Sequence, residues 1–128
     1  MTMYRKLTFF LLICFITFSA FAQKRVNILY VGNSLTYYNN LPELVNRIAK
    51  CDSVEITYRM LAFPNYALED HLNEGHVITE TKTGVYDFVV VQQGPSSSQV
   101  GRSMLVNDGL TLAKLCTENK SRLAFYTV

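Results

Sequence analysis

Ser34 is the residue of this sequence whose surroundings best suit nucleophilic chemistry. It lies in the segment GNSLT, residues 32–36, directly after the apolar and β-branched residues 26–31. Reaction sites of open α/β sheets form beyond the carboxyl ends of the strands. A serine hydroxyl there can attack an acyl carbon, and a backbone N–H beside it can stabilise the oxyanion that forms. Taken alone, the segment also fits an ordinary turn or a phosphate-binding turn, although the glycine spacing of dinucleotide and P-loop sites is missing.

The elements that must position Ser34 alternate between strand and helix patterns. Short apolar or alternating runs predict strands, and apolar residues at helical spacing predict helices. The predicted strands cover residues 26–31, 54–60, 86–92 and 123–128, and the predicted helices cover residues 40–50, 67–73 and 99–119. Gly101 and Gly109 weaken the expected continuity of the last helix.

The helix over residues 40–50 has the clearest start. Asn40 can act as its cap, Pro42 is tolerated in the first turn, and Glu43 follows three residues after the cap. The residues expected on its apolar face are Leu41, Leu44, Val45 and Ile48.

Apolar strands separated by helices indicate a parallel sheet that is covered on both faces. We therefore predict an α/β fold, a flavodoxin-like three-layer α/β/α sandwich with strand order 2-1-3-4. Right-handed crossovers then place the 40–50 helix on one face and the 99–119 helix on the other. The sheet would separate Cys51 from Cys116, so we expect two free thiols, because a disulfide requires Cα atoms within about 7 Å.

Residues 1–22 have the layout of a secretory signal peptide. Arg5 and Lys6 precede the apolar residues 7–18, and small residues at the A-x-A positions predict cleavage between Ala22 and Gln23. The apolar run is too short for a transmembrane anchor, which needs about 20 residues. We expect a secreted or periplasmic protein, without a stable membrane anchor after cleavage.

The composition excludes several classes of protein. Hydrophobic residues make up 49% of the chain, so a disordered chain is excluded. The net charge is +2, and without Arg5 and Lys6 the acidic and basic side chains of residues 23–128 are equal in number. No basic patch suggests nucleic acid as a partner. Two remaining cysteines make neither a disulfide framework nor a zinc site.

Three segments, in order along the chain, resemble the SGNH (GDSL-like) hydrolase superfamily. ILYVGNSLT at residues 28–36, followed by NLP at 40–42, is similar to the first block of its bacterial branch that carries GNSLT in place of GDSL. NYALEDH at residues 65–71 resembles the second block, and YDFVVVQQ at 86–93 resembles the strand that leads to the third. The resemblance spans nearly all of residues 23–128.

The resemblance implies a serine esterase without metal or cofactor. Ser34 matches the nucleophile, and its N–H matches the first oxyanion donor. Asn65 stands where the family has a glycine whose N–H is the second donor, and asparagine tolerates the left-handed backbone of such a turn. The third donor of the family is an asparagine in a G-x-N-D block; here Gln92 or Gln93 offers an amide of the same kind.

The general base of the family is not found in this sequence. That base belongs to a D-x-x-H block after a further strand, and residues 23–128 would form only the N-terminal part of such a domain, without its fifth strand. His71 fits the second-block helix, His76 lies in a polar loop, and Asp108 has no nearby histidine. Because a serine without a base loses several powers of ten in rate, we expect little activity from this chain alone.

Two functions from different classes remain open. The first is an exported SGNH-type esterase that acts on a small-molecule or carbohydrate ester, such as an acetyl ester of a sugar. The second is a non-catalytic domain that binds a ligand or glycan at residues 32–36. The serine run at residues 96–98 could supply another nucleophile, but its position before the 99–119 helix indicates a loop and an N-cap.

Overall fold

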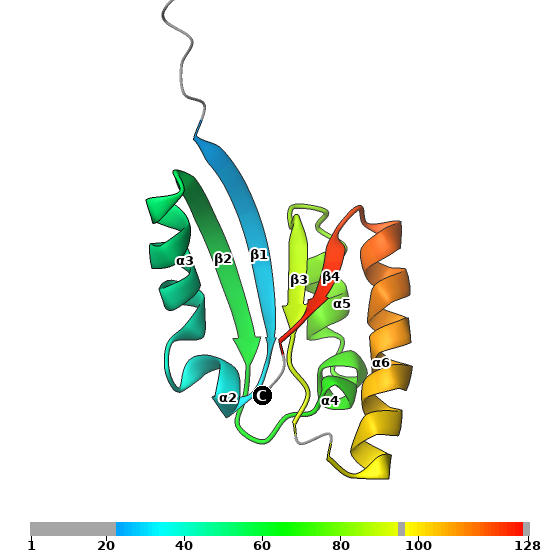
Figure 1. Ribbon diagram of the computed structural model, residues 1–128. Helices are drawn as coiled ribbons and strands as arrows, with labels where there is room; N and C mark the ends of the chain where they lie inside the picture. The colour runs from blue at the N-terminus through cyan, green and yellow to red at the C-terminus, as the bar shows by residue number, and fades with distance from the viewer. Residues whose placement is uncertain (1–22, 95–96, 127–128) are drawn as a thin grey trace, which may run out of the picture.

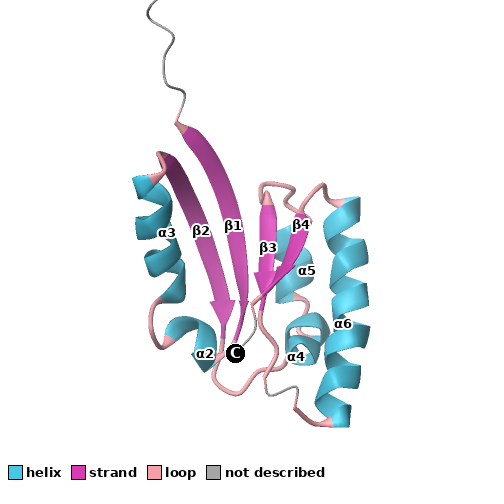
Figure 2. Cartoon of the chain, in the orientation of Figure 1, coloured by secondary structure: helices cyan, strands magenta, loops and turns pink. Residues whose placement is uncertain are grey.

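The computed structural model describes residues 23–94 and 97–126. Its sheet comprises four parallel strands in the order β2-β1-β3-β4 (Figures 1 and 2). The strands are β1 (Lys24–Gly32), β2 (Val54–Ala62), β3 (Phe88–Val91) and β4 (Arg122–Phe125). This confirms the predicted α/β class and the predicted strand order. The predicted signal peptide, residues 1–22, lies outside the described residues.

Five helices connect and cover these strands within the described residues. They are α2 (Ser34–Tyr37), α3 (Leu41–Cys51), α4 (Leu68–Asn73), α5 (His76–Thr81) and α6 (Gln99–Glu118). Figure 1 shows α3 beside β2, whereas α4, α5 and α6 gather on the side of β3 and β4. Right-handed crossovers in this strand order put α3 on one face of the sheet and α4, α5 and α6 on the opposite face.

The core lies between the sheet and the helices α4, α5 and α6. Its buried members are Leu29, Val31, Leu61, Leu68, Val77, Val89, Val91, Leu112, Leu115 and Cys116. Alternate residues of β1 serve the two faces, because successive side chains of a strand point in opposite directions. Leu29 and Val31 therefore join this core, whereas Ile28 and Tyr30 are buried on the face of α3.

The start and the buried side of α3 differ from the prediction. Asn40 is the N-cap residue, but its backbone is left-handed at φ 50° and its side chain makes no capping hydrogen bond. The helix buries Pro42 and Asn46, and it leaves Leu44 46% and Ile48 68% exposed. The predicted apolar face was wrong in part because α3 contacts mainly β2, at the edge of the sheet, which covers only a narrow side of the helix.

One other segment departs from the sequence prediction, and the predicted helix over residues 99–119 is confirmed. His76 begins the short helix α5 instead of lying in a loop, because Gly75 turns the chain at φ 76° directly before it. Helix α6 is continuous through Gly101 and Gly109, and both glycines are buried. At Gly109 the missing side chain permits close packing, since a Cβ there would lie 3.0 Å from Cζ of Phe125.

Cys51 and Cys116 are both free thiols, as predicted. Cys51 is exposed at the end of α3, and Cys116 belongs to the core, where burial raises the pKa of its thiol to about 11. Among the described residues, no helix combines the length and apolarity that crossing a membrane would require.

Candidate active site

The candidate nucleophile lies at the carboxyl end of the central strand. Strand β1 ends at Gly32, and Ser34 is the first residue of α2. Asn33 caps this helix: its Oδ1 accepts a hydrogen bond from the Leu35 N–H at 3.1 Å. Its Nδ2 donates to the Tyr66 carbonyl at 3.0 Å, so one side chain joins the turn to the loop after β2. The cap leaves the Ser34 N–H free of partners among the described residues, as is usual for the first N–H groups of a helix.

The Gln92 side chain is hydrogen bonded to two residues of this turn. Its Oε1 accepts from the Asn33 N–H at 3.2 Å and from the Thr36 hydroxyl at 3.1 Å. Because a backbone N–H can only donate, the amide oxygen must face the turn. The amide Nε2 then donates to the Gln93 carbonyl at 2.6 Å.

This arrangement corrects the prediction for Gln92. The residue is only 2% exposed and is not among those that line the pocket beside Ser34. By sequence, Gln92 and Gln93 are equivalent candidates for the third oxyanion donor. The two differ in the structure because neighbouring residues leave a strand in opposite directions, and only Gln93 points into the pocket.

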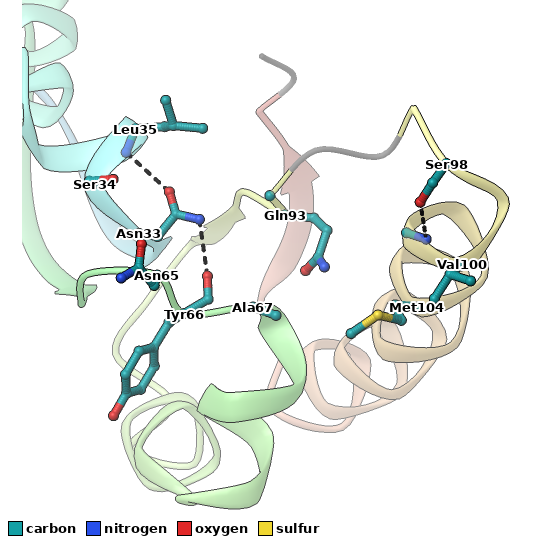
Figure 3. A pocket seen from close by; sticks show the side chains of 12 residues that line it. Asn33, Ser34, Leu35, Asn65, Tyr66, Ala67, Gln93, Ser98, Val100 and Met104 are labelled. Atoms are coloured by element: carbon teal, nitrogen blue, oxygen red, sulfur yellow. Dashed lines mark hydrogen bonds between the residues drawn. The ribbon is translucent and has the colours of Figure 1, made fainter.

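Gln93 has the orientation that an amide donor needs. Its Oε1 accepts a hydrogen bond from the Leu68 N–H at 2.9 Å, at the start of α4. The oxygen is thereby fixed on α4, and Nε2 has no hydrogen-bond partner among the described residues. Figure 3 shows this side chain reaching into the space between the Ser34 turn and α6.

Asn65 takes up the left-handed backbone predicted for it, with φ 64°. It is exposed, and it borders the same pocket as Ser34 and Gln93. The sequence prediction of a tight turn at this position is therefore confirmed. Its service as an oxyanion donor stays a prediction.

The pocket itself has a volume of about 560 Å³ (Figure 3). Its lining residues are Asn33, Ser34, Leu35, Asn65, Tyr66, Ala67, Gln93, Gly94, Ser98, Val100, Gly101 and Met104. Polar groups come from the strand ends, whereas Val100 and Met104 of α6 form an apolar wall. No Asp, Glu, Lys, Arg or His is among these described residues, so the pocket suits an uncharged group.

Neither described histidine lies in this pocket. His71 is completely buried, and its Nε2 is 2.8 Å from the Gly32 carbonyl oxygen. Burial lowers the pKa of His71, although the hydrogen bond to Gly32 and the nearby Glu74 and Asp70 act in the opposite direction. His76 is exposed and lies 3.7 Å from Glu74. Asp108, on α6, is partly buried, and burial with the nearby Glu69 raises the pKa of its carboxyl.

Sequence reasoning missed several contributors to the site. Asn33 and Thr36 lie inside the GNSLT segment, but their hydrogen-bond partners lie far along the chain. Tyr66 is 33 positions from Asn33, and Gln92 is 56 positions from Thr36. Val100 and Met104 come from a helix whose spacing predicts only core residues. The serine run was interpreted correctly at Ser98, which caps α6 by accepting from the Gly101 N–H at 3.1 Å; Ser96 lies outside the described residues.

The described residues also contain no group of three or more His, Cys, Asp or Glu side chains that could hold a metal ion. The chemistry that these residues can offer is thus a serine hydroxyl, two backbone N–H groups and an amide around a neutral pocket.

Comparisons with known proteins support the fold. No family model matches the sequence, and no curated protein matches it. A solved structure described as "a putative SGNH hydrolase from Slackia heliotrinireducens" is similar, with a TM-score of 0.65 and 22% sequence identity. The match covers 80% of this chain and 56% of that chain, so the chain spans little more than half of the structure's length. The chain has an SGNH hydrolase-like fold.

Proposed function

We propose that this chain carries the nucleophile and the oxyanion site of an exported SGNH-type serine esterase. The observation that supports the proposal best is the shared pocket of the Ser34 turn and the Gln93 amide. Ser34 is the first residue of α2, and its backbone N–H has no partner among the described residues, so it can donate to an oxyanion.

The proposed reaction is acyl transfer through a covalent intermediate. The Ser34 hydroxyl oxygen attacks the ester carbonyl carbon and loses its proton to a base. The tetrahedral oxyanion accepts hydrogen bonds from the Ser34 N–H, the Asn65 N–H and Gln93 Nε2. The alcohol leaves with the proton, and water then hydrolyses the acyl-serine. The base is not among the described residues that line the pocket, since the sequence has two histidines and neither His71 nor His76 lies there.

The substrate class follows from the charge and the opening of the pocket. With no charged side chain among its described lining residues, the pocket suits a neutral acyl group such as acetyl. The open side could admit the sugar that carries the ester. The predicted signal peptide supports action on an extracellular or periplasmic carbohydrate ester.

One observation favours a second candidate, a domain that binds a ligand or glycan without catalysis. No described residue lining the pocket has a side chain that could act as a base near neutral pH. A pocket of this kind can hold a neutral ligand through Asn33, Gln93 and the apolar wall of α6.

The first test measures turnover of p-nitrophenyl acetate by residues 23–128. Because no base stands beside Ser34 among the described residues, we expect a rate several powers of ten below that of ordinary esterases. Ser34-dependent turnover at ordinary enzyme rates would contradict this and would make His71 or His76 the suspected base.

A second test separates the esterase from the binding domain without needing the base. A thiol ionises far more readily than a hydroxyl, so Ser34→Cys should attack the same ester by itself. In a Cys51→Ala background, we expect mass spectrometry to find one acetyl group on residue 34. Ser103→Cys, on the exposed side of α6, is the matched control. Equal acylation at the two positions would contradict an oxyanion site at Ser34 and favour the binding domain.

A further inference from the structure

The peptide group between Gly32 and Asn33 is hydrogen bonded at both of its ends. Its carbonyl oxygen lies 2.8 Å from His71 Nε2 and also accepts from the Phe63 N–H at 3.3 Å. Its N–H donates to Gln92 Oε1 at 3.2 Å. His71 and Gln92 come from α4 and from the end of β3, 39 and 59 residues from their partners in the turn.

We propose that His71 and Gln92 are positioning residues that clamp this peptide plane and thereby aim the Ser34 N–H and hydroxyl into the pocket. The proposal rests on the proposed function, because it assigns these residues a purpose in acyl transfer at Ser34. Neither residue touches the substrate in this scheme.

The clamp matters because the nucleophile is the next residue along the chain. The next peptide group carries the Ser34 N–H, and only two backbone dihedrals of Asn33 separate the two planes. A donor stabilises an oxyanion only when it is already aimed at the place where the charge develops. A rotation of the first plane would therefore move the donor and the nucleophile together.

The neutral ring of His71 has only one tautomer that suits this role. A carbonyl oxygen accepts and never donates, so Nε2 must carry the proton. Nδ1 is buried without a hydrogen-bond partner among the described residues, so the neutral ring has its proton at Nε2 alone. Tyr66 and Phe63 pack against the ring, with centroids 5.1 Å and 5.8 Å from its centre. His71 is held as a donor and is not free to serve as the base.

Gly32 and Thr36 hold the Gln92 amide in the position where it accepts from the Asn33 N–H. A Cβ at Gly32 would lie 2.8 Å from Gln92 Oε1 and would also collide with Thr36 Oγ1. Only glycine allows the Gln92 oxygen to approach this closely. The same oxygen accepts from Thr36 at 3.1 Å, which holds the amide in its orientation.

The test begins with residues 23–128 without substitution, labelled with ¹⁵N. We expect the His71 ring to show a protonated Nε2 and an unprotonated Nδ1 at neutral pH, and the Asn33 amide to exchange slowly with solvent. A proton on Nδ1 instead, or fast exchange at Asn33, would overturn the proposal without any variant being made.

The second arm measures acylation of the introduced thiol at position 34 in the Ser34→Cys, Cys51→Ala chain. His71→Leu and Gln92→Met each remove one of the two side-chain hydrogen bonds to the peptide plane, while the Phe63 N–H stays on the Gly32 carbonyl. We expect each variant to slow acylation about tenfold, the equivalent of one hydrogen bond. His71→Gln keeps an N–H donor and should stay within about threefold of its parent. Urea unfolding of each variant identifies any chain that does not fold. If a variant does not fold, the ¹⁵N measurements on the unmodified chain decide whether the proposal holds.

The outcomes distinguish this inference from the proposed function. Folded His71→Leu and Gln92→Met chains that acylate at the parental rate, with the amide resonance of residue 34 unmoved, would overturn the clamp. Absence of acylation in the parent would instead contradict the esterase. The His71 tautomer and the Asn33 exchange rate then still decide whether the peptide plane is held.

Discussion

The Ser34 turn and the flank formed by β4 and α6 belong to the same sheet but are built in opposite ways. At the turn, three buried polar side chains, those of Asn33, Thr36 and Gln92, all have hydrogen-bond partners. On the flank, Leu110 is 67% and Phe125 49% exposed. They border a groove of about 380 Å³ whose described lining residues are Leu105, Val106, Gly109, Leu110, Ala113, Leu123 and Phe125.

The two regions differ in whether the described residues satisfy their buried polar groups and cover their apolar side chains. Buried polar groups are costly unless they are paired, so a turn with its partners in place is held in one geometry. Exposed apolar side chains have no such requirement. Leu105 and Leu123 of the flank pack partly against the core, whereas Leu110 and Phe125 keep much of their surface in contact with water. The described residues thus satisfy the buried polar side chains of the Ser34 turn by themselves. The exposed apolar side chains of the flank, in contrast, contribute little to the free energy of unfolding.

The largest effect should separate the core side of α6 from its flank side. Leu112 is completely buried, so Leu112→Ala should lower the free energy of unfolding by about 2–5 kcal/mol. Leu110→Ala, two residues earlier on the exposed side, should change it by less than about 0.5 kcal/mol. Urea unfolding of both variants measures this. Similar losses at the two positions would mean that another chain covers the flank in solution.

A glycine pair tests how tightly the turn is packed. Gly32→Ala forces a methyl group against Gln92 and Thr36, and overpacking of this kind costs about 1–3 kcal/mol. Among the described residues, the matched change Gly94→Ala meets Asn33 Nδ2 alone, at 3.8 Å, and should be nearly neutral. Urea unfolding compares the two. A neutral Gly32→Ala would show that the turn adapts, and the contrast with the flank would be lost.

The smallest effect concerns pH. Burial lowers the pKa of His71 below its ordinary 6.5, so the unfolded chain binds this proton first as the pH falls. The free energy of unfolding should therefore decline from pH 7 to about pH 5.5, below the ordinary pKa of histidine. The groups near the ring are Glu74, Asp70 and His76.

Two matched variants assign this pH dependence. His71→Gln should flatten the decline, and His76→Gln, at an exposed histidine, should leave it in place. Thermal unfolding at several pH values provides the measurement. An unchanged slope in His71→Gln would place the titrating group elsewhere and would contradict the view that the His71 ring is held buried and neutral beside the turn.

Much of the fold could be predicted because its signals are local. Residues 26–31 and 88–91 are apolar and β-branched, and such runs indicate strands wherever they occur. The order β2-β1-β3-β4 agrees with the flavodoxin-like arrangement that the alternation of strands and helices suggested, and the handedness of the crossovers then assigns each helix to a face of the sheet. The buried side of α3 could not be predicted, since it depends on how much of the sheet the helix covers. Leu44 and Ile48 are therefore exposed in spite of their helical spacing.

The sequence by itself determined the candidate nucleophile and its place after the central strand. These depend on residue type and on position relative to a strand, which are properties of short segments. The turn at Asn65 was predicted from the resemblance of residues 65–71 to a family block. Only the tertiary structure decided that Gln92 supports the turn while Gln93 enters the pocket, and that His71 is bonded to Gly32. Such roles depend on partners 25 to 59 residues away along the chain, and a side chain acquires them only when the sheet and helices bring those partners within hydrogen-bonding distance.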